Sequence, residues 1–250
     1  MDKMIFTVMN GMKIVEQRQA NTFNELANLS TVGFKKSFSY AASSRDLVGG
    51  DMLASRAFPT VVGQNIVDLK AGPFVPTNNP MDLYVTEKGL FSVLDESGQE
   101  AYTRRGDMKI TSNGVLTTGA GHLLLGDDGP ITIPPSKKVE ISADGAVNII
   151  PANAATNELV QIARLKLVNG EDQTIQIRSD GLYQTADRQI LEADANIKIQ
   201  VGGTEGSSAN AIDSMVQMIR DSREYEMHVR ILKNAKELST SSTSMMRLDG

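Results

Sequence analysis

The sequence contains no cysteine and no tryptophan, and only 5% of its residues are aromatic. Without cysteine the chain can form no disulfide and offers no thiolate nucleophile or cysteine-based zinc site. The scarcity of aromatic residues disfavours a module that recognises sugars or peptides. Only two histidines are present, His122 and His228, so a catalytic metal would depend on carboxylates alone.

Long apolar runs are also missing. None approaches the roughly 18 residues that a membrane span requires. Asp2, Lys3, Asn10 and Lys13 interrupt the opening residues, which therefore do not resemble a secretory signal. The net charge of −5 argues against nucleic acid as the main partner. Taken alone, these features predict a cytoplasmic protein.

Two amphipathic stripes are present, one at each end of the 250-residue chain. The first predicts a helix over 1–29 with a heptad pattern, and the second a helix from 212 to about 238. Because an isolated amphipathic helix is marginal in water, packing must cover both stripes. We expect neighbouring subunits to cover them in preference to a self-contained helical hairpin.

Between the stripes the pattern changes to β. Residues 37–80 predict an extended arm broken by Gly and Pro. Residues 81–206 predict an antiparallel sandwich or open barrel of short strands. Asn-Gly and Asp-Gly pairs such as Asn113-Gly114 and Asp144-Gly145 mark the turns. The strand candidates are 83–85, 90–94, 108–111, 131–133, 139–141, 162–168, 174–177 and 197–201.

The expected fold class is therefore α+β, with long terminal helices that form a coiled-coil-like layer and an antiparallel β domain inserted between them. The expected boundaries are 1–36 for the N-terminal helix and corner, 37–80 for the arm, 81–206 for the β domain and 207–250 for the C-terminal helix. Asn210 is the expected N-cap of the second helix. The Ser/Thr tract at 239–244 is either a frayed tail or a continuation of that helix, and we favour order in an assembly and disorder in the free chain.

Each candidate for chemistry has a simpler structural interpretation. Asp127-Asp128 precedes Gly129-Pro130 and predicts a turn. His122 lies near Gly119 and Gly121 but lacks the third glycine of a dinucleotide-binding fingerprint. His228 follows Glu224 by four residues, which favours a surface ion pair or a solvated face. The basic pairs Lys35-Lys36, Arg104-Arg105 and Lys137-Lys138 predict solvated faces or intersubunit contacts. We therefore expect neither an enzyme nor a cofactor or metal site.

One segment carries a resemblance to a known family. Residues 24–36, NELANLSTVGFKK, are similar to the N-terminal signature of the axial proteins of the bacterial flagellum, although Glu25 stands where that family usually has Asn. Residues 79–116, 141–147 and 205–226 are similar to later parts of the same family, in the same order. The length and the opening MDKMIFTVMNG most resemble the proximal members of the flagellar basal-body rod family.

This resemblance implies a structural subunit whose terminal helices form the inner layer of a tubular rod that transmits torque and encloses an export channel. The implied partners are other rod subunits, copies of itself and the flagellar export apparatus. The implied location is the basal body in the periplasm, reached without a cleavable signal peptide, which reverses the cytoplasmic expectation. The alternatives are a distal rod or other axial protein and, from another class, a soluble β-sandwich binding module with oligomerising helices.

The predicted assembly interface combines the two stripes with the corner that ends the first helix. We expect Gly33→Val to block assembly, because Gly33 can take the left-handed conformation that ends helices. The full predicted set is Ile5, Val8, Met12, Val15, Leu26, Asn28, Ser30, Thr31, Gly33, Phe34, Ile212, Met215, Ile219, Tyr225, Val229 and Leu232.

Overall fold

The computed structural model describes residues 2–43, 60–153 and 158–247, and it divides them into two compact units. The helix unit takes its described residues from 1–27, 38–65 and 210–250. The β unit takes its described residues from 28–37 and 66–209. The chain is α+β, with terminal helices flanking antiparallel sheets, as the sequence predicts.

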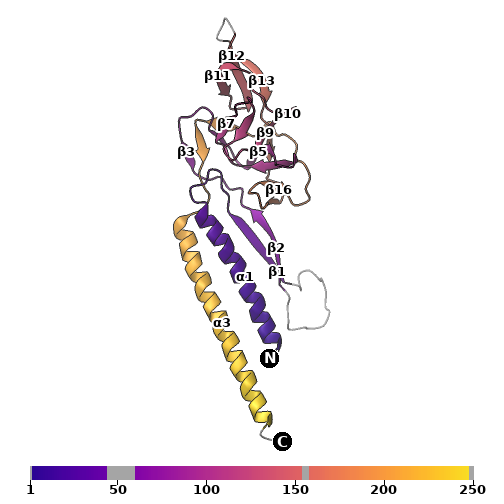
Figure 1. Cartoon of the computed structure of the whole chain (residues 1–250), viewed down its shortest axis with the longest axis vertical. Coiled ribbons are helices and arrows are strands. Elements are labelled where there is room, and N and C mark those ends of the chain that lie inside the picture. Colours follow the sequence, from indigo (N-terminus) through magenta and orange to yellow (C-terminus); the bar gives the residue numbers. More distant parts are fainter. Residues whose placement is uncertain (1, 44–59, 154–157, 248–250) are drawn as a thin grey trace. The chain divides into compact units, whose positions relative to one another are not determined.

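The helix unit contains α1 (Asp2–Ala27) and α3 (Ala211–Arg247), which lie side by side and run in opposite directions (Figure 1). Asn210 caps α3 as predicted, because its Oδ1 accepts hydrogen bonds from the backbone N–H of Ile212 at 2.9 Å and of Asp213 at 3.4 Å. The Ser/Thr tract at 239–244 continues α3. Figure 1 also shows β1 (Ser37–Ser43) and β2 (Thr60–Val67) as neighbouring strands.

The strands of the described chain form one large sheet and three smaller ones. The large sheet follows the order β1-β2-β15-β16-β6-β5-β9-β8-β7, with β10 added to β9 and β14 to β5. The smaller sheets are β11-β12-β13, β17-β4 and β18-β3. The remaining bounds are β3 (Phe74–Pro76), β4 (Leu83–Val85), β5 (Gly89–Leu94), β6 (Glu100–Thr103), β7 (Met108–Ile110), β8 (Leu116–Thr118), β9 (Leu123–Gly126), β10 (Gly129–Pro130), β11 (Ser136–Ile141), β12 (Ala146–Pro151), β13 (Val160–Arg164), β14 (Leu167–Asn169), β15 (Ile175–Ile177), β16 (Tyr183–Thr185), β17 (Ile199–Val201) and β18 (Gly203–Glu205).

Alternation of apolar and polar residues predicts several strands correctly. Ile197 and Ile199 are buried while Lys198 and Gln200 are exposed, as expected for one face turned to the core. The larger core cluster includes Phe91, Leu124 and Ile149, and a second cluster gathers around Leu90, Val168 and two buried tyrosines, Tyr102 and Tyr183.

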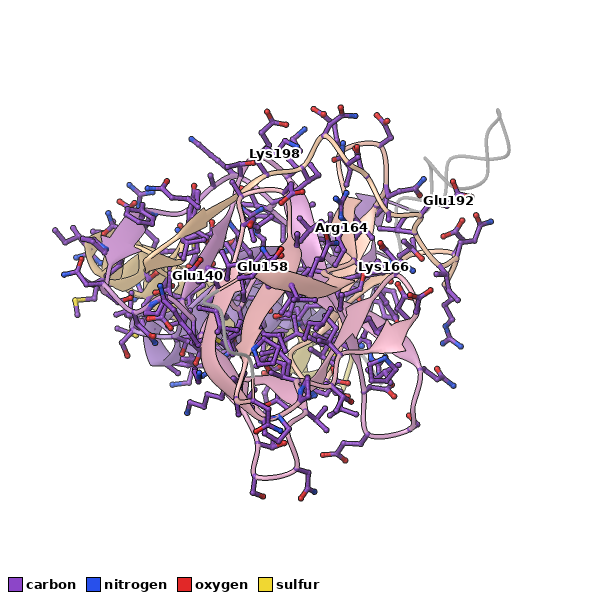
Figure 2. All side chains as sticks on the ribbon, turned by 90° about the horizontal axis from the view of Figure 1, so that it is seen from above. Glu140, Glu158, Arg164, Lys166, Glu192 and Lys198 are labelled. Carbon is purple, nitrogen blue, oxygen red and sulfur yellow. The ribbon has the colours of Figure 1, made fainter. Side chains whose placement is uncertain are left out.

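Two strand predictions are wrong. Both isoleucines of residues 131–133 are buried, but the segment is not a strand. Its one β-bridge joins Thr132 to Val115. Prolines lie on both sides of this segment and cannot donate to a ladder. Residues 162–168 do not form one strand, because β13 and β14 belong to different sheets. Figure 2 labels Arg164 and Lys166, which lie at this break.

Candidate assembly interface

The buried residues at the contact between α1 and α3 are spaced seven or fourteen residues apart. On α1 these are Val15 and Thr22, and on α3 they are Ser214, Asp221 and Ala235. Seven residues make two helical turns, so each set lies along one side of its helix. The α3 side of this contact is therefore built from small and polar residues, whereas the α1 side carries part of the predicted stripe.

Polar side chains join the two helices along this contact. Ser214 Oγ donates to Glu25 Oε2 at 2.9 Å, and Arg18 NH2 lies 2.9 Å from Asp221 Oδ1. Arg18 also pairs with Glu224. The imidazole of His228 lies against Gly11, where an added Cβ would approach the ring carbon Cε1 to 2.9 Å. The predicted pairing with Glu224 is present, with His228 Nε2 3.9 Å from Glu224 Oε1, but the solvated face is not, because the ring packs on α1 with 18% of the side chain exposed.

The first part of the predicted stripe on α3, formed by Ile212, Met215 and Ile219, lies away from the contact with α1 and is exposed in the single chain. Ile212 is 72% exposed, Met215 51% and Ile219 52%. Tyr225 and Val229 are exposed as well, and Leu232 is half-buried. Of the predicted α1 residues, Val15 is buried, and Ile5, Val8, Met12 and Leu26 are half-buried. Part of the α1 stripe therefore packs on α3, whereas the first part of the α3 stripe faces away from α1.

The predicted corner lies in the β unit. Asn28 accepts hydrogen bonds at its backbone oxygen from the Thr31 N–H, at 3.2 Å, and at its side-chain oxygen from the Thr31 hydroxyl, at 3.0 Å. Ser30 is exposed, and Phe34 is half-buried. Gly33 has a φ of +68°, the left-handed conformation that the sequence predicts. Its N–H donates to the carbonyl of Glu205 at 2.7 Å, and its own carbonyl accepts from the Tyr183 hydroxyl at 3.3 Å.

A buried ion cluster lies beside this corner. The side chains of Lys35, Arg104 and Glu205 are all fully buried. Glu205 Oε1 accepts from Lys35 Nζ at 2.5 Å and from the Gly72 N–H at 2.5 Å, and Oε2 accepts from Arg104 Nε at 2.6 Å. The remaining donors also have partners, because Lys35 Nζ reaches the Lys70 carbonyl at 2.6 Å and Arg104 NH1 reaches the Glu87 carbonyl at 2.9 Å. The Glu205 carboxylate thus joins its own strand to three other segments of the β unit.

The electrostatics of the cluster follow from burial and pairing. Burial alone raises the pKa of Glu205, but hydrogen bonding and the positive charges of Arg104 and Lys35 outweigh it, so the pKa lies below its ordinary value. Burial, together with the nearby Arg104, lowers the pKa of Lys35. Burial also raises the pKa of Tyr183, so its hydroxyl stays protonated and can donate to Gly33.

The cluster corrects the prediction for two basic pairs. Lys35 and Arg104 are not on solvated faces, because each is fully buried against Glu205. Sequence reasoning missed Glu205 because its partners lie 170 and 101 residues away. The basic residues at the corner and in the Tyr102–Gly106 segment were visible as motifs, but no local pattern indicates which acid neutralises them.

Across 2–43, 60–153 and 158–247, no group of three or more His, Asp or Glu side chains is placed to hold a metal ion. Asp127 and Asp128 occupy the turn between β9 and β10, as predicted, at one side of a polar hollow that Gln161 and Arg164 also line. Among the residues that the structure describes, no helix has the length and apolar character of a membrane span.

Comparison with known proteins decides the family. The chain is 33% identical over 243 residues to the flagellar basal-body rod protein FlgF of Salmonella typhimurium, a match that covers 95% of each protein. The chain belongs to the flagellar basal-body rod protein family. It is also 29% identical to FlgF of Escherichia coli over 99% of this chain and 100% of that protein. The FlgG rod protein of Bacillus subtilis is 26% identical, over 97% and 98% of the two chains.

Two family descriptions match particular parts of this rod-family chain. Residues 84–149 match the flagellar hook protein FlgE/F/G D1 domain, and residues 200–245 match the flagellar basal body rod FlgEFG protein C-terminal region. The first match lies within the β unit and includes Arg104 of the ion cluster. The second begins just before Glu205 and includes the outward stripe of α3. These matches confirm the resemblance to the flagellar rod family that the sequence shows at residues 24–36, 79–116, 141–147 and 205–226.

Proposed function

We propose that this rod-family chain is a structural subunit of the proximal flagellar rod and that it assembles through the outward face of α3. The other partners in this proposal are copies of the same chain and the rod subunits above and below it. The observation that carries the proposal is the row of exposed apolar residues Ile212, Met215 and Ile219 on a helix whose other side is already occupied by α1.

The energetics support a neighbouring helix as the cover for this face. Burial of an exposed aliphatic side chain stabilises by about 1.5–3 kcal/mol. An apolar stripe of this length left in water promotes association. Heptad spacing of the buried residues on both helices further supports a coiled-coil-like inner layer, in which α1 and α3 of one subunit meet helices of the next.

The proximal position is favoured over the distal rod by two observations. Identity is higher to the relatives named FlgF, at 33% and 29%, than to a relative named FlgG, at 26%. The length and opening residues of the chain point the same way. In this proposal the subunit transmits torque mechanically, encloses an export channel and reaches the periplasm through the flagellar export apparatus. It carries out no catalysis.

The test is electron microscopy of the purified chain mixed with candidate rod subunits, comparing the parent with Met215→Lys/Ile219→Lys. The parent should form tubular or stacked helical assemblies. The lysine variant should remain unassembled, with the helical circular dichroism of the parent, because charges in this face cannot be buried in a neighbouring subunit.

The matched control is Met215→Leu/Ile219→Leu, which keeps the face apolar and should still assemble. A parent chain that stays a discrete monomer with a ligand cleft would favour the soluble binding module instead. Assembly by the lysine variant would show that this face is not the interface.

A further inference from the structure

The contact between α1 and α3 contains a regular polar row, formed by Gly11, Arg18 and Glu25 on α1 and Ser214, Asp221 and His228 on α3. Each step of seven residues forward along α1 meets a step of seven residues backward along α3. Glu25 pairs with Ser214, Arg18 with Asp221 and Gly11 with the ring of His228. We propose that this polar row fixes the antiparallel register of α1 on α3.

The apolar residues alone specify this register poorly. On α1, Val8 and Val15 are identical residues one heptad apart. Half-buried residues of this helix recur with the same spacing of seven. A slip of one heptad moves one helix by about 10 Å along the other and returns similar side chains to similar places. Something other than the apolar pattern must therefore distinguish the observed register from its neighbours.

The polar row makes that distinction. A slip in one direction places Glu25 opposite Asp221 and Arg18 opposite His228, so like charges meet and the fully buried Asp221 loses its cation. A slip in the other direction places Asp221 opposite Gly11, again without a cation. A buried carboxylate without a partner is strongly unfavourable, so both alternatives are disfavoured.

The unpaired polar atoms and the glycine of the row favour a role in selecting the helix register over a role in stabilising the helix pair. Within the described residues, Arg18 Nε, Asp221 Oδ2 and His228 Nδ1 are buried without a hydrogen-bond partner. Gly11 lies inside a helix, where glycine is unfavourable, but any larger residue would press on the His228 ring. Apolar residues of similar volume often stabilise a contact as well as a buried ion pair does, so stability alone does not account for these polar side chains.

The register also determines which residues of α3 face outward. The polar row holds Ser214 and Asp221 toward α1, which leaves Ile212, Met215 and Ile219 on the other side. The inference does not require the proposed function, because it concerns the two helices of one chain.

The register can be measured by the distance between two spin labels in the full chain. Cysteines introduced at Lys13 and Glu237, which are offset along the helix pair so that a slip changes their separation, would be the only ones, because the natural sequence has none. Both residues are exposed and lie in helices of the same unit. The parent should give one narrow distance by double electron–electron resonance.

In the same labelled background, Arg18→Met/Asp221→Leu should keep the helical circular dichroism but add a second distance population from chains slipped by about 10 Å. The control Glu16→Leu/Arg220→Met removes one acid and one base from exposed positions of the same helices and should keep the single distance. A single unchanged distance in Arg18→Met/Asp221→Leu would overturn the proposal, as would a broad distribution in the parent.

The charge-reversed pair Arg18→Asp/Asp221→Arg provides an independent reading if the apolar variant loses its helices. It permits an ion pair in the observed register and, after a slip of one heptad, a second one between the introduced arginine and Glu25, so it should give two distances. A single parental distance in this variant would refute the proposal.

Discussion

At the residue scale, Glu205 shows how one carboxylate can be required by several distant segments. Its oxygens accept from Lys35, Gly72 and Arg104, all in buried surroundings. Buried ion pairs add little stability compared with apolar residues of the same size, but removal of one partner leaves an uncompensated charge. Glu205 therefore matters chiefly because Lys35 and Arg104 are already buried beside the corner.

Gly33 is the residue at which the corner tolerates least change. Its φ is +68°, and an added Cβ would lie 2.5 Å from the backbone carbonyl of Arg104. A β-branched residue is strained in this conformation even in open space. Here it would also have to displace backbone that holds the ion cluster.

We predict that Gly33→Val lowers the free energy of unfolding by more than about 2 kcal/mol, measured by urea denaturation of the β unit signal. The matched control is Gly98→Val, because Gly98 has a φ of +77° but nothing within 4 Å of an added Cβ. The control should show only the backbone penalty. Equal losses in the two variants would mean that the contact with Arg104 carries no cost.

At the element scale, α3 is 37 residues long and takes its stability from three sources: its cap, its contact with α1 and any neighbour that covers its outward face. Of these three, only the cap depends on residues that are close together in the sequence. The capping geometry at Asn210 was accordingly predictable, as were the left-handed Gly33 and the glycine turns at 114 and 145.

The side of α3 that contacts α1 was not predictable by the same reasoning. Periodicity arguments treat apolar residues as buried, yet Ile212 and Ile219 are exposed while Ser214 and Asp221 are buried. A polar contact of this kind depends on Arg18 and Glu25 of a helix about two hundred residues away. For the same reason the sequence could not reveal Glu205 as the partner of Lys35 and Arg104.

The cap gives a prediction for α3 as an element. Asn210→Ala should lower stability by about 1 kcal/mol, measured as the urea midpoint of the helical circular dichroism signal, because the N–H groups of Ile212 and Asp213 lose their acceptor. Asn210→Ser keeps a capping oxygen and should lose much less. If serine is as damaging as alanine, the side-chain oxygen is not what begins the helix.

At the scale of the whole molecule, the two units are stabilised in different ways. The helix unit joins α1 and α3 through a narrow contact with a polar row, and it leaves an apolar face open. The β unit contains the large apolar cores and the ion cluster. Such a division agrees with the proposed assembly, in which the β unit folds within one chain and neighbouring subunits cover the outward face of α3.

The carboxylates of the β unit should make its stability sensitive to acid. Asp95 accepts from Arg178 at 2.8 Å and from the N–H groups of Gln99 and Ser97, and these bonds lower its pKa from 3.8 to about 2. The pKa of Glu205 is lowered as well. Because both groups bind protons more readily in the unfolded chain, their contributions are present above the unfolded pKa values and are lost as pH falls through the folded ones.

We therefore predict that the thermal midpoint of the β unit is steady from pH 7 to about 5 and falls between about pH 4 and 2. Calorimetry across this range should show a shallower fall for Asp95→Asn, which has no proton to take up, despite a lower midpoint at pH 7. The control is Asp144→Asn, because Asp144 pairs with Arg164 at a position where both side chains are more than 40% exposed, and such pairs contribute little. That variant should follow the parent throughout. An Asp95→Asn curve as steep as that of the parent would show that acid destabilises the β unit through other carboxylates, with Glu205→Gln as the next variant to compare.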